Sequence, residues 1–100
     1  MTAVIDTALH APARLQIAAV LARVEEVEFS TLRDIAQVSD SVLSKHLSSL
    51  TDAGYVSLRK AAQDGRQRTW AAFTPKGAKA FRNHMAALQA LIERAQLALD

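Results

Sequence analysis

A chain of 100 residues, half of them hydrophobic, is long enough for one compact domain with its own core. It contains no cysteine, which excludes disulfides, thiolate nucleophiles and cysteine-based metal sites. The N-terminus lacks the pattern of a signal peptide and no run of about 18 apolar residues occurs, so we expect a cytoplasmic protein without membrane contact.

Positive charge is concentrated in one part of the chain, although the net charge is only +2. Residues 57–82 hold seven Lys and Arg against one Asp, whereas residues 1–56 hold four against seven Asp and Glu. Such a segment is typical of a surface that binds a polyanion. A solvated basic face remains an equal alternative on charge alone.

The N-terminal quarter predicts one helix and one short strand. Residues 1–8 carry no strong pattern and are expected to fray. A broad apolar stripe after Pro12, which suits a first helical turn, predicts a helix within residues 8–25. The alternating run Val27–Phe29 then predicts an edge strand.

Residues 30–54 predict two helices separated by a tight turn. Ser30 is the expected N-cap of the first helix, whose inward residues are Leu32, Ile35 and Ala36. Gln37 and Val38 form the expected turn.

The second helix of this pair has clear boundaries. Ser39 is its expected N-cap, and Asp40 lies favourably near the positive end of the helix dipole. Its inward residues are Leu43, Leu47 and Leu50, and it ends at Gly54. Together the two helices have the pattern of a helix-turn-helix.

The C-terminal half predicts a hairpin and a long helix. Strand-like runs over residues 55–62 and 67–74 flank Asp64-Gly65, a strong hairpin signal. Thr74 caps a helix over residues 75–98, with Pro75 in its first turn. The predicted fold is one domain over residues 1–100, mainly α with a small β-hairpin (α+β), in the order α-β-α-α-β-β-α.

The outward face of the second helix of the pair is the first candidate site. In a helix-turn-helix this helix fits the major groove of double-stranded DNA. Short hydroxyls and a cation suit contacts with phosphates and base edges, and the candidates are Asp40, Ser41, Ser44, Lys45 and Ser48. An ordinary amphipathic helix with a polar face remains an alternative.

The hairpin is the second candidate site. Its tip carries Arg66 and Arg68, and Arg59 lies on the preceding strand. Such a ribbon can follow the DNA backbone or insert Arg66 into the minor groove. Tyr55 and the other hairpin aromatics are expected to pack in the core, because no exposed row of aromatics suits single-stranded nucleic acid.

The combined motifs give a specific resemblance over about residues 9–95. The chain resembles the winged-helix regulators, in particular the small MarR-like and ArsR-like repressors, in the pattern Ser39-x-Ser41-x-x-Ser44-x-His46-Leu47-x-x-Leu50-x-x-x-Gly54-x-Val56, followed by Gly65-Arg66 and Thr74-Pro75-x-Gly77. The resemblance implies that residues 39–48 form the recognition helix, residues 55–74 the wing, and the terminal helices a dimer interface. It also implies repression relieved by a small-molecule effector. The chain lacks the longer C-terminal dimerisation arm of MarR proteins.

The last helix predicts a homodimer. Its apolar stripe has too many large side chains for one small core to cover, and the interface candidates are Phe81, Met85, Leu88 and Ile92. A two-fold dimer would present two recognition helices to a palindromic operator. Packing wholly within the monomer is the alternative.

No pattern in the chain indicates catalysis or a cofactor. The serines lack a base and an orienting group, so an enzyme is not expected. His46 is expected to be structural or to contact phosphate. His10 and His84 would approach one another across a dimer, but no histidine shows the spacing of a ligand pair, so no metal is expected. The alternative to a DNA-binding regulator is a winged-helix protein-interaction module that has no need of a basic wing.

Overall fold

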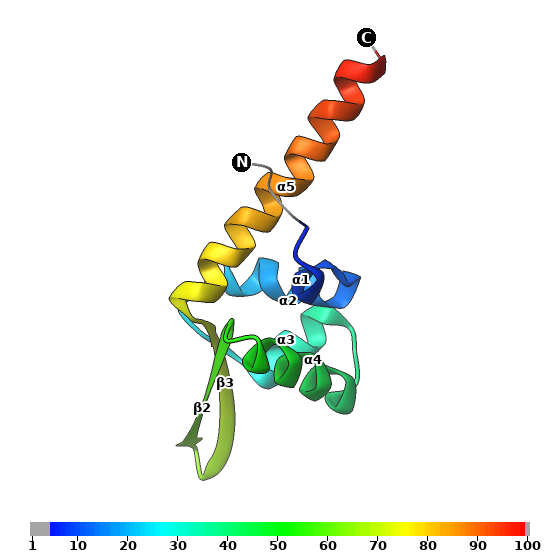
Figure 1. Cartoon of the computed structure of the whole chain (residues 1–100). Coiled ribbons are helices and arrows are strands. Elements are labelled where there is room, and N and C mark those ends of the chain that lie inside the picture. Colours follow the sequence, from blue (N-terminus) through cyan, green and yellow to red (C-terminus); the bar gives the residue numbers. More distant parts are fainter. Residues whose placement is uncertain (1–4, 100) are drawn as a thin grey trace.

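The computed structural model describes residues 5–99 and contains five helices and three strands in that range (Figure 1). In chain order the elements are α1 (Thr7–His10), α2 (Pro12–Leu21), β1 (Val27–Glu28), α3 (Phe29–Ala36), α4 (Asp40–Asp52), β2 (Val56–Gln63), β3 (Arg66–Phe73) and α5 (Pro75–Leu99). The predicted fold class is confirmed. The order differs from the prediction by one additional helix at the N-terminus.

The helix predicted within residues 8–25 is present as α2, with Pro12 in its first turn, but it is shorter than that range and a separate short helix, α1, precedes it. Ala11 between them is extended, with φ −61° and ψ 139°. The ring of Pro12 clashes with a helical conformation of the residue before it, which explains the break. Residues 1–4, where fraying was expected, lie outside the described range. Asp6 is held, since its side chain accepts the Ala8 N–H at 2.9 Å and caps α1.

Helix α3 begins one residue earlier than Ser30. Glu28 is at its N-cap position in an extended conformation, so the chain enters the helix directly from β1. The prediction of Ser30 as the N-cap is therefore wrong, and its hydroxyl instead donates to the Glu28 carboxylate at 2.8 Å. Leu32 and Ala36 are buried as predicted, but Ile35 is 51 % exposed and does not join the core.

Helix α4 confirms its predicted boundaries and inner face. The Ser39 hydroxyl accepts the Val42 N–H at 3.2 Å, and Gln37 makes the preceding turn in the left-handed region. Gly54, at φ +80°, follows the last helical turn. The inner residues are at most 1 % exposed and lie in the central core: Leu43, Leu47 and Leu50.

The hairpin predicted from Asp64-Gly65 is also confirmed. Strands β2 and β3 pair antiparallel from Val56↔Phe73 to Gln63↔Arg66. Asp64 and Gly65 both have positive φ, as a two-residue hairpin turn requires. Strand β1 adds to the other edge of β3, which gives the order β1-β3-β2.

Helix α5 is fixed to the base of the hairpin. The Thr74 hydroxyl accepts the Gly77 N–H at 3.0 Å, which confirms the predicted cap. A Cβ on Gly77 would lie 2.0 Å from the Tyr55 carbonyl oxygen, so only glycine allows this approach. The helix then leaves the body, and residues 91–99 are all exposed (Figure 1).

The N-terminal segment is attached to α5 and to the start of the hairpin. The Tyr55 hydroxyl donates to the Asp6 carboxylate at 2.6 Å, and the Asp6 backbone N–H donates to His84 Nδ1 at 3.0 Å. His10 stacks edge-on against His84 with ring centroids 5.5 Å apart. The two histidines therefore contact one another within one chain.

This attachment predicts loss of stability in acid. His84 is fully buried, and burial, followed by the neighbouring His10, lowers its pKa, although Asp6 opposes the shift. A histidine whose pKa is lowered in the folded protein binds a proton more readily in the unfolded chain. Its contribution to the free energy of unfolding is therefore fully present above about pH 6.5, the unfolded pKa, and is lost as the pH falls below that value. One such group contributes a slope of at most about 1.4 kcal/mol per pH unit.

We therefore expect the free energy of unfolding, measured by urea titration, to fall as the pH decreases from 7 to 5. The His84→Asn variant, which keeps an acceptor for the Asp6 N–H, should show a shallower decrease. His46, whose pKa is also lowered by burial, contributes to the decrease that remains. If the free energy of unfolding of His84→Asn decreases with pH as steeply as that of the unaltered protein, His84 is not the source of the acid sensitivity.

Candidate nucleic-acid interface

The outward face of α4 carries four of the predicted contact residues. Because the leucines of α4 point into the core, its polar side chains point away from it. The predicted contact residues of α4 that are exposed and lack an ion pair among the described residues are Ser41, Ser44, Lys45 and Ser48. The Ser39 and Ser41 hydroxyls lie 3.2 Å apart at the start of the helix. This face offers hydroxyl donors and acceptors with one cation, and Val42, which follows Ser41, adds an apolar side chain that is 41 % exposed.

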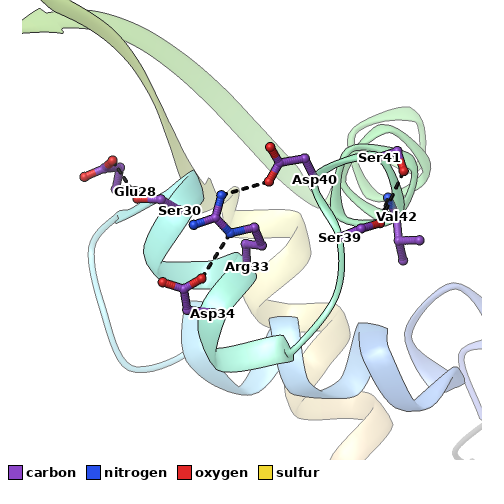
Figure 2. A network of polar contacts seen from close by, with 8 residues as sticks. All are labelled: Glu28, Ser30, Arg33, Asp34, Ser39, Asp40, Ser41 and Val42. Carbon is purple, nitrogen blue, oxygen red and sulfur yellow. Dashed lines mark hydrogen bonds and ion pairs between the residues drawn. The ribbon is translucent and has the colours of Figure 1, made fainter.

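Asp40 differs from the other candidates on α4 because it is ion-paired within the chain. Figure 2 shows Arg33 of α3 reaching across to α4, with Nη1 2.9 Å from the Asp40 carboxylate and Nε 3.0 Å from Asp34. These carboxylates raise the pKa of Arg33, Asp40 foremost. Arg33 therefore joins the two helices and offsets the charge of Asp40. Sequence reasoning missed Arg33, because only the turn geometry brings residues seven positions apart together.

His46 lies on the side of α4 that faces the N-terminal helices. Its Nδ1 accepts a hydrogen bond from Arg14 Nε at 3.2 Å, and Arg14 also donates to the Ala8 carbonyl at 3.3 Å. Burial lowers the pKa of His46, and the charges of Arg14 and Lys45 lower it further. His46 is thus a neutral acceptor with a structural role.

The arginines of the hairpin fall into two groups. Arg66 is exposed next to the turn, and within residues 5–99 it has no ion pair. Arg59 binds Glu26 at 2.6 Å and lies over the Trp70 ring, 5.7 Å from its centroid. Arg68 binds Glu28 at 2.6 Å. Arg66 is thus available to a ligand, whereas Arg59 and Arg68 are engaged in the sheet.

A shallow cleft separates the hairpin from the start of α3. It has a volume of 340 Å³ and is lined by Glu28, Phe29, Ser30, Arg66, Gln67, Arg68 and Thr69. The Glu28 carboxylate, whose pKa is lowered by hydrogen bonds from Ser30 and Arg68, lies at this cleft. The cleft marks where the outer hairpin separates from the body.

Helix α4 and the free end of the hairpin lie on the same side of the molecule. In Figure 1 both are at the end opposite the C-terminal half of α5. Within residues 5–99 no three His, Cys, Asp or Glu side chains are grouped to hold a metal ion. In the same range no helix is both long and apolar enough to span a membrane.

A helix-turn-helix followed by a β-hairpin and a long helix defines the class of winged-helix proteins. The family model for the winged helix DNA-binding domain matches residues 13–92, and the chain belongs to this family. It is also 35 % identical over 72 residues to an uncharacterized protein of Methanocaldococcus jannaschii, a match that covers 72 % of this chain and 78 % of the relative.

Solved structures of transcriptional regulators share the fold. A transcriptional regulator homologue from Pyrococcus horikoshii aligns with a TM-score of 0.82 and 26 % identity, covering 88 % of this chain and 87 % of the other. A MarR-family regulator from Silicibacter pomeroyi aligns with a TM-score of 0.63 and 26 % identity, and the match covers 85 % of this chain and 56 % of the regulator. The PcaV regulator from Streptomyces coelicolor aligns with a TM-score of 0.74 and 19 % identity, and the match covers 96 % of this chain and 66 % of PcaV. The resemblance inferred from the sequence motifs is confirmed at the level of family and fold.

Proposed function

We propose that this protein is a sequence-specific regulator of transcription that binds double-stranded DNA with α4 in the major groove and the hairpin along the adjoining backbone or minor groove. The observation that carries the proposal is that α4, whose Ser and Lys side chains are exposed, lies at the same end of the molecule as the hairpin (Figure 1). Arg66 beside the hairpin turn is exposed and has no ion pair among residues 5–99. Major-groove base edges and phosphates are the partners that such groups recognise.

The internal ion pairs divide the predicted contact residues by role. Direct contacts are assigned to the exposed residues without an ion pair among those described, namely Ser41, Ser44, Lys45, Ser48 and Arg66. Asp40, Arg59 and Arg68 have carboxylate or guanidinium partners within the chain, and we assign them indirect roles.

A homodimer is the proposed binding form. The outer half of α5 exposes a series of large apolar side chains, which a single copy leaves in water: Leu91 (49 %), Ile92 (58 %), Leu97 (75 %) and Leu99 (88 %). Of the predicted interface residues, Met85 and Leu88 are half-buried, whereas Phe81 packs against Phe73 inside the monomer. The proposed interface therefore centres beyond Phe81. A two-fold dimer of this kind fits a palindromic operator.

Repression under the control of a small-molecule effector is the proposed mode of regulation, in the cytoplasm. Two structural neighbours support an effector: NadR was solved in complex with 4-hydroxyphenylacetate, and PcaV in complex with its natural ligand. Both share only the fold with this chain, which spans about two thirds of their length.

The first test of DNA binding is its salt dependence. We expect Arg66→Ala and Lys45→Ala to weaken binding to duplex DNA, because each removes a cation from the proposed interface. Each lost phosphate contact should reduce the slope of log affinity against log salt by about 0.9. Fluorescence anisotropy with a mixed-sequence duplex at several salt concentrations measures both quantities.

Lys79→Ala is the matched control, since Lys79 is an exposed cation near the start of α5, outside the proposed DNA face and the proposed dimer interface. It should leave the slope unchanged. If neither Arg66→Ala nor Lys45→Ala alters affinity or slope, the assigned DNA face is wrong. If the unaltered protein fails to bind any duplex, the DNA-binding function is rejected in favour of the alternative, a winged-helix protein-interaction module.

A second test concerns the dimer. Ile92→Glu should leave the fold intact, because this side chain is exposed in the monomer, but should produce monomers in light scattering. Loss of the paired contact should weaken binding to a palindromic site by about 10²-fold or more. Asn83→Glu, an exposed substitution on the opposite side of the same helix, should remain dimeric. If Ile92→Glu remains dimeric, the dimer interface does not lie on the outer half of α5.

A further inference from the structure

One face of the sheet carries a set of opposite charges that joins all three strands. In the strand register, Trp70 of β3 lies between Glu28 of β1 and Arg59 of β2. Arg68 lies two residues from Trp70 in β3, so the alternation of a strand places both on the same face. Glu26 precedes β1, and its contact with Arg59 brings it to this face. The face therefore has carboxylates on the β1 side and guanidinium groups on the hairpin.

The contacts pair these charges individually. Arg59 binds Glu26 through two hydrogen bonds of 2.6 and 3.2 Å while it lies over Trp70, and so reaches from the edge strand across β3. Arg68 Nη1 donates to Glu28 Oε1 at 2.6 Å, and the Ser30 hydroxyl donates to the same oxygen at 2.8 Å. The side chain of Glu28 is only 19 % exposed and that of Arg68 31 %, so this pair is better shielded from water than Arg59–Glu26.

The position of these pairs matters because, within residues 5–99, no third strand pairs with the outer hairpin. Strand β1 pairs only through Val27↔Ala71 and Glu28↔Trp70. Beyond Trp70, residues 66–69 of β3 pair with β2 alone. An isolated two-stranded ribbon is marginally stable. The Arg68–Glu28 pair is located where the ribbon leaves the body, and it therefore controls the direction in which the tip points.

We propose that Glu26 and Glu28 are positioning residues for DNA binding, which hold the wing through Arg59 and Arg68 so that Arg66 reaches the duplex. This inference rests on the proposed function. It also explains why Arg59 and Arg68 are not assigned to phosphate contacts. To contact DNA, Arg68 would have to leave the Glu28 carboxylate, which is mostly shielded from water and has no second cation among the described residues.

Exchanging the charges of the Arg68–Glu28 pair tests this proposal. Arg68→Glu breaks the pair and should weaken duplex binding about tenfold. The double variant Glu28→Arg/Arg68→Glu restores a pair at the same place and should recover most of that loss, with the unaltered protein's salt slope. If Arg68 instead contacts phosphate itself, the double variant stays as weak as Arg68→Glu, which would overturn the proposal.

The matched control separates positioning from net charge. Glu25→Arg/Arg68→Glu restores the same net charge from an exposed neighbouring position but cannot rebuild the pair. It should remain as weak as Arg68→Glu. Recovery equal to that of the charge exchange would show that charge alone matters, and the positioning role would be rejected.

The milder variant Glu28→Ala gives a test of opposite sign. It removes a negative charge and frees Arg68, so a direct contact by Arg68 predicts tighter binding and a steeper salt slope. The positioning role predicts weaker binding despite the gain in net positive charge. A tighter complex overturns the proposal.

Hydrogen exchange tests the wing without DNA and so separates this inference from the proposed function. The amides of residues 66–69 should exchange faster in Glu28→Ala and Arg68→Glu and return to the original rate in the charge exchange. Unchanged exchange in both variants contradicts the positioning role. Failure of the unaltered protein to bind duplex DNA would instead refute the proposed function and leave the exchange result to stand by itself.

Discussion

The burial of three leucines on one side of α4 is the constraint on which the rest of the structure depends. Leu43, Leu47 and Leu50 lie in the centre of the core, between the N-terminal helices and the sheet. Since the helix cannot rotate without exposing them, its hydroxyl-rich face must point outward. Gly54 then ends the helix with a left-handed residue, which turns the chain directly into the hairpin. The orientation of the proposed recognition face and the starting point of the wing thus have one common origin.

Ion pairs within the chain reduce the number of cations in residues 57–82 that are available to a ligand. The segment is strongly positive in sequence, but Arg59 and Arg68 are bound by carboxylates that precede α3. Arg33 in the same way offsets Asp40 at the start of α4. Arg66 at the hairpin tip and Lys45 on α4 are exposed and have no ion pair among the described residues. The family membership and the structural neighbours agree with this picture of a winged-helix DNA-binding domain.

Features that depend on near neighbours were predictable from the sequence. Ser39 as a cap, Gly54 as a helix end, Asp64-Gly65 as a hairpin turn and Thr74 as the cap of α5 all follow from chemistry within about four residues. The same local reasoning failed at Ser30, because β1 continues directly into α3 and leaves no separate cap. It also failed at Ile35, since the helical period alone does not say where the core ends.

The sequence by itself determined the order of elements from α2 onward, the inner face of α4 and the position of the hairpin turn, since each is encoded in short-range periodicity and turn chemistry. Only the tertiary structure decided which charges are used internally. Arg59 and Glu26 are 33 residues apart, Arg68 and Glu28 40, and Asp6 and His84 78. No local pattern encodes such pairs, because they exist only once the sheet has formed and α5 has packed beside the N-terminal segment.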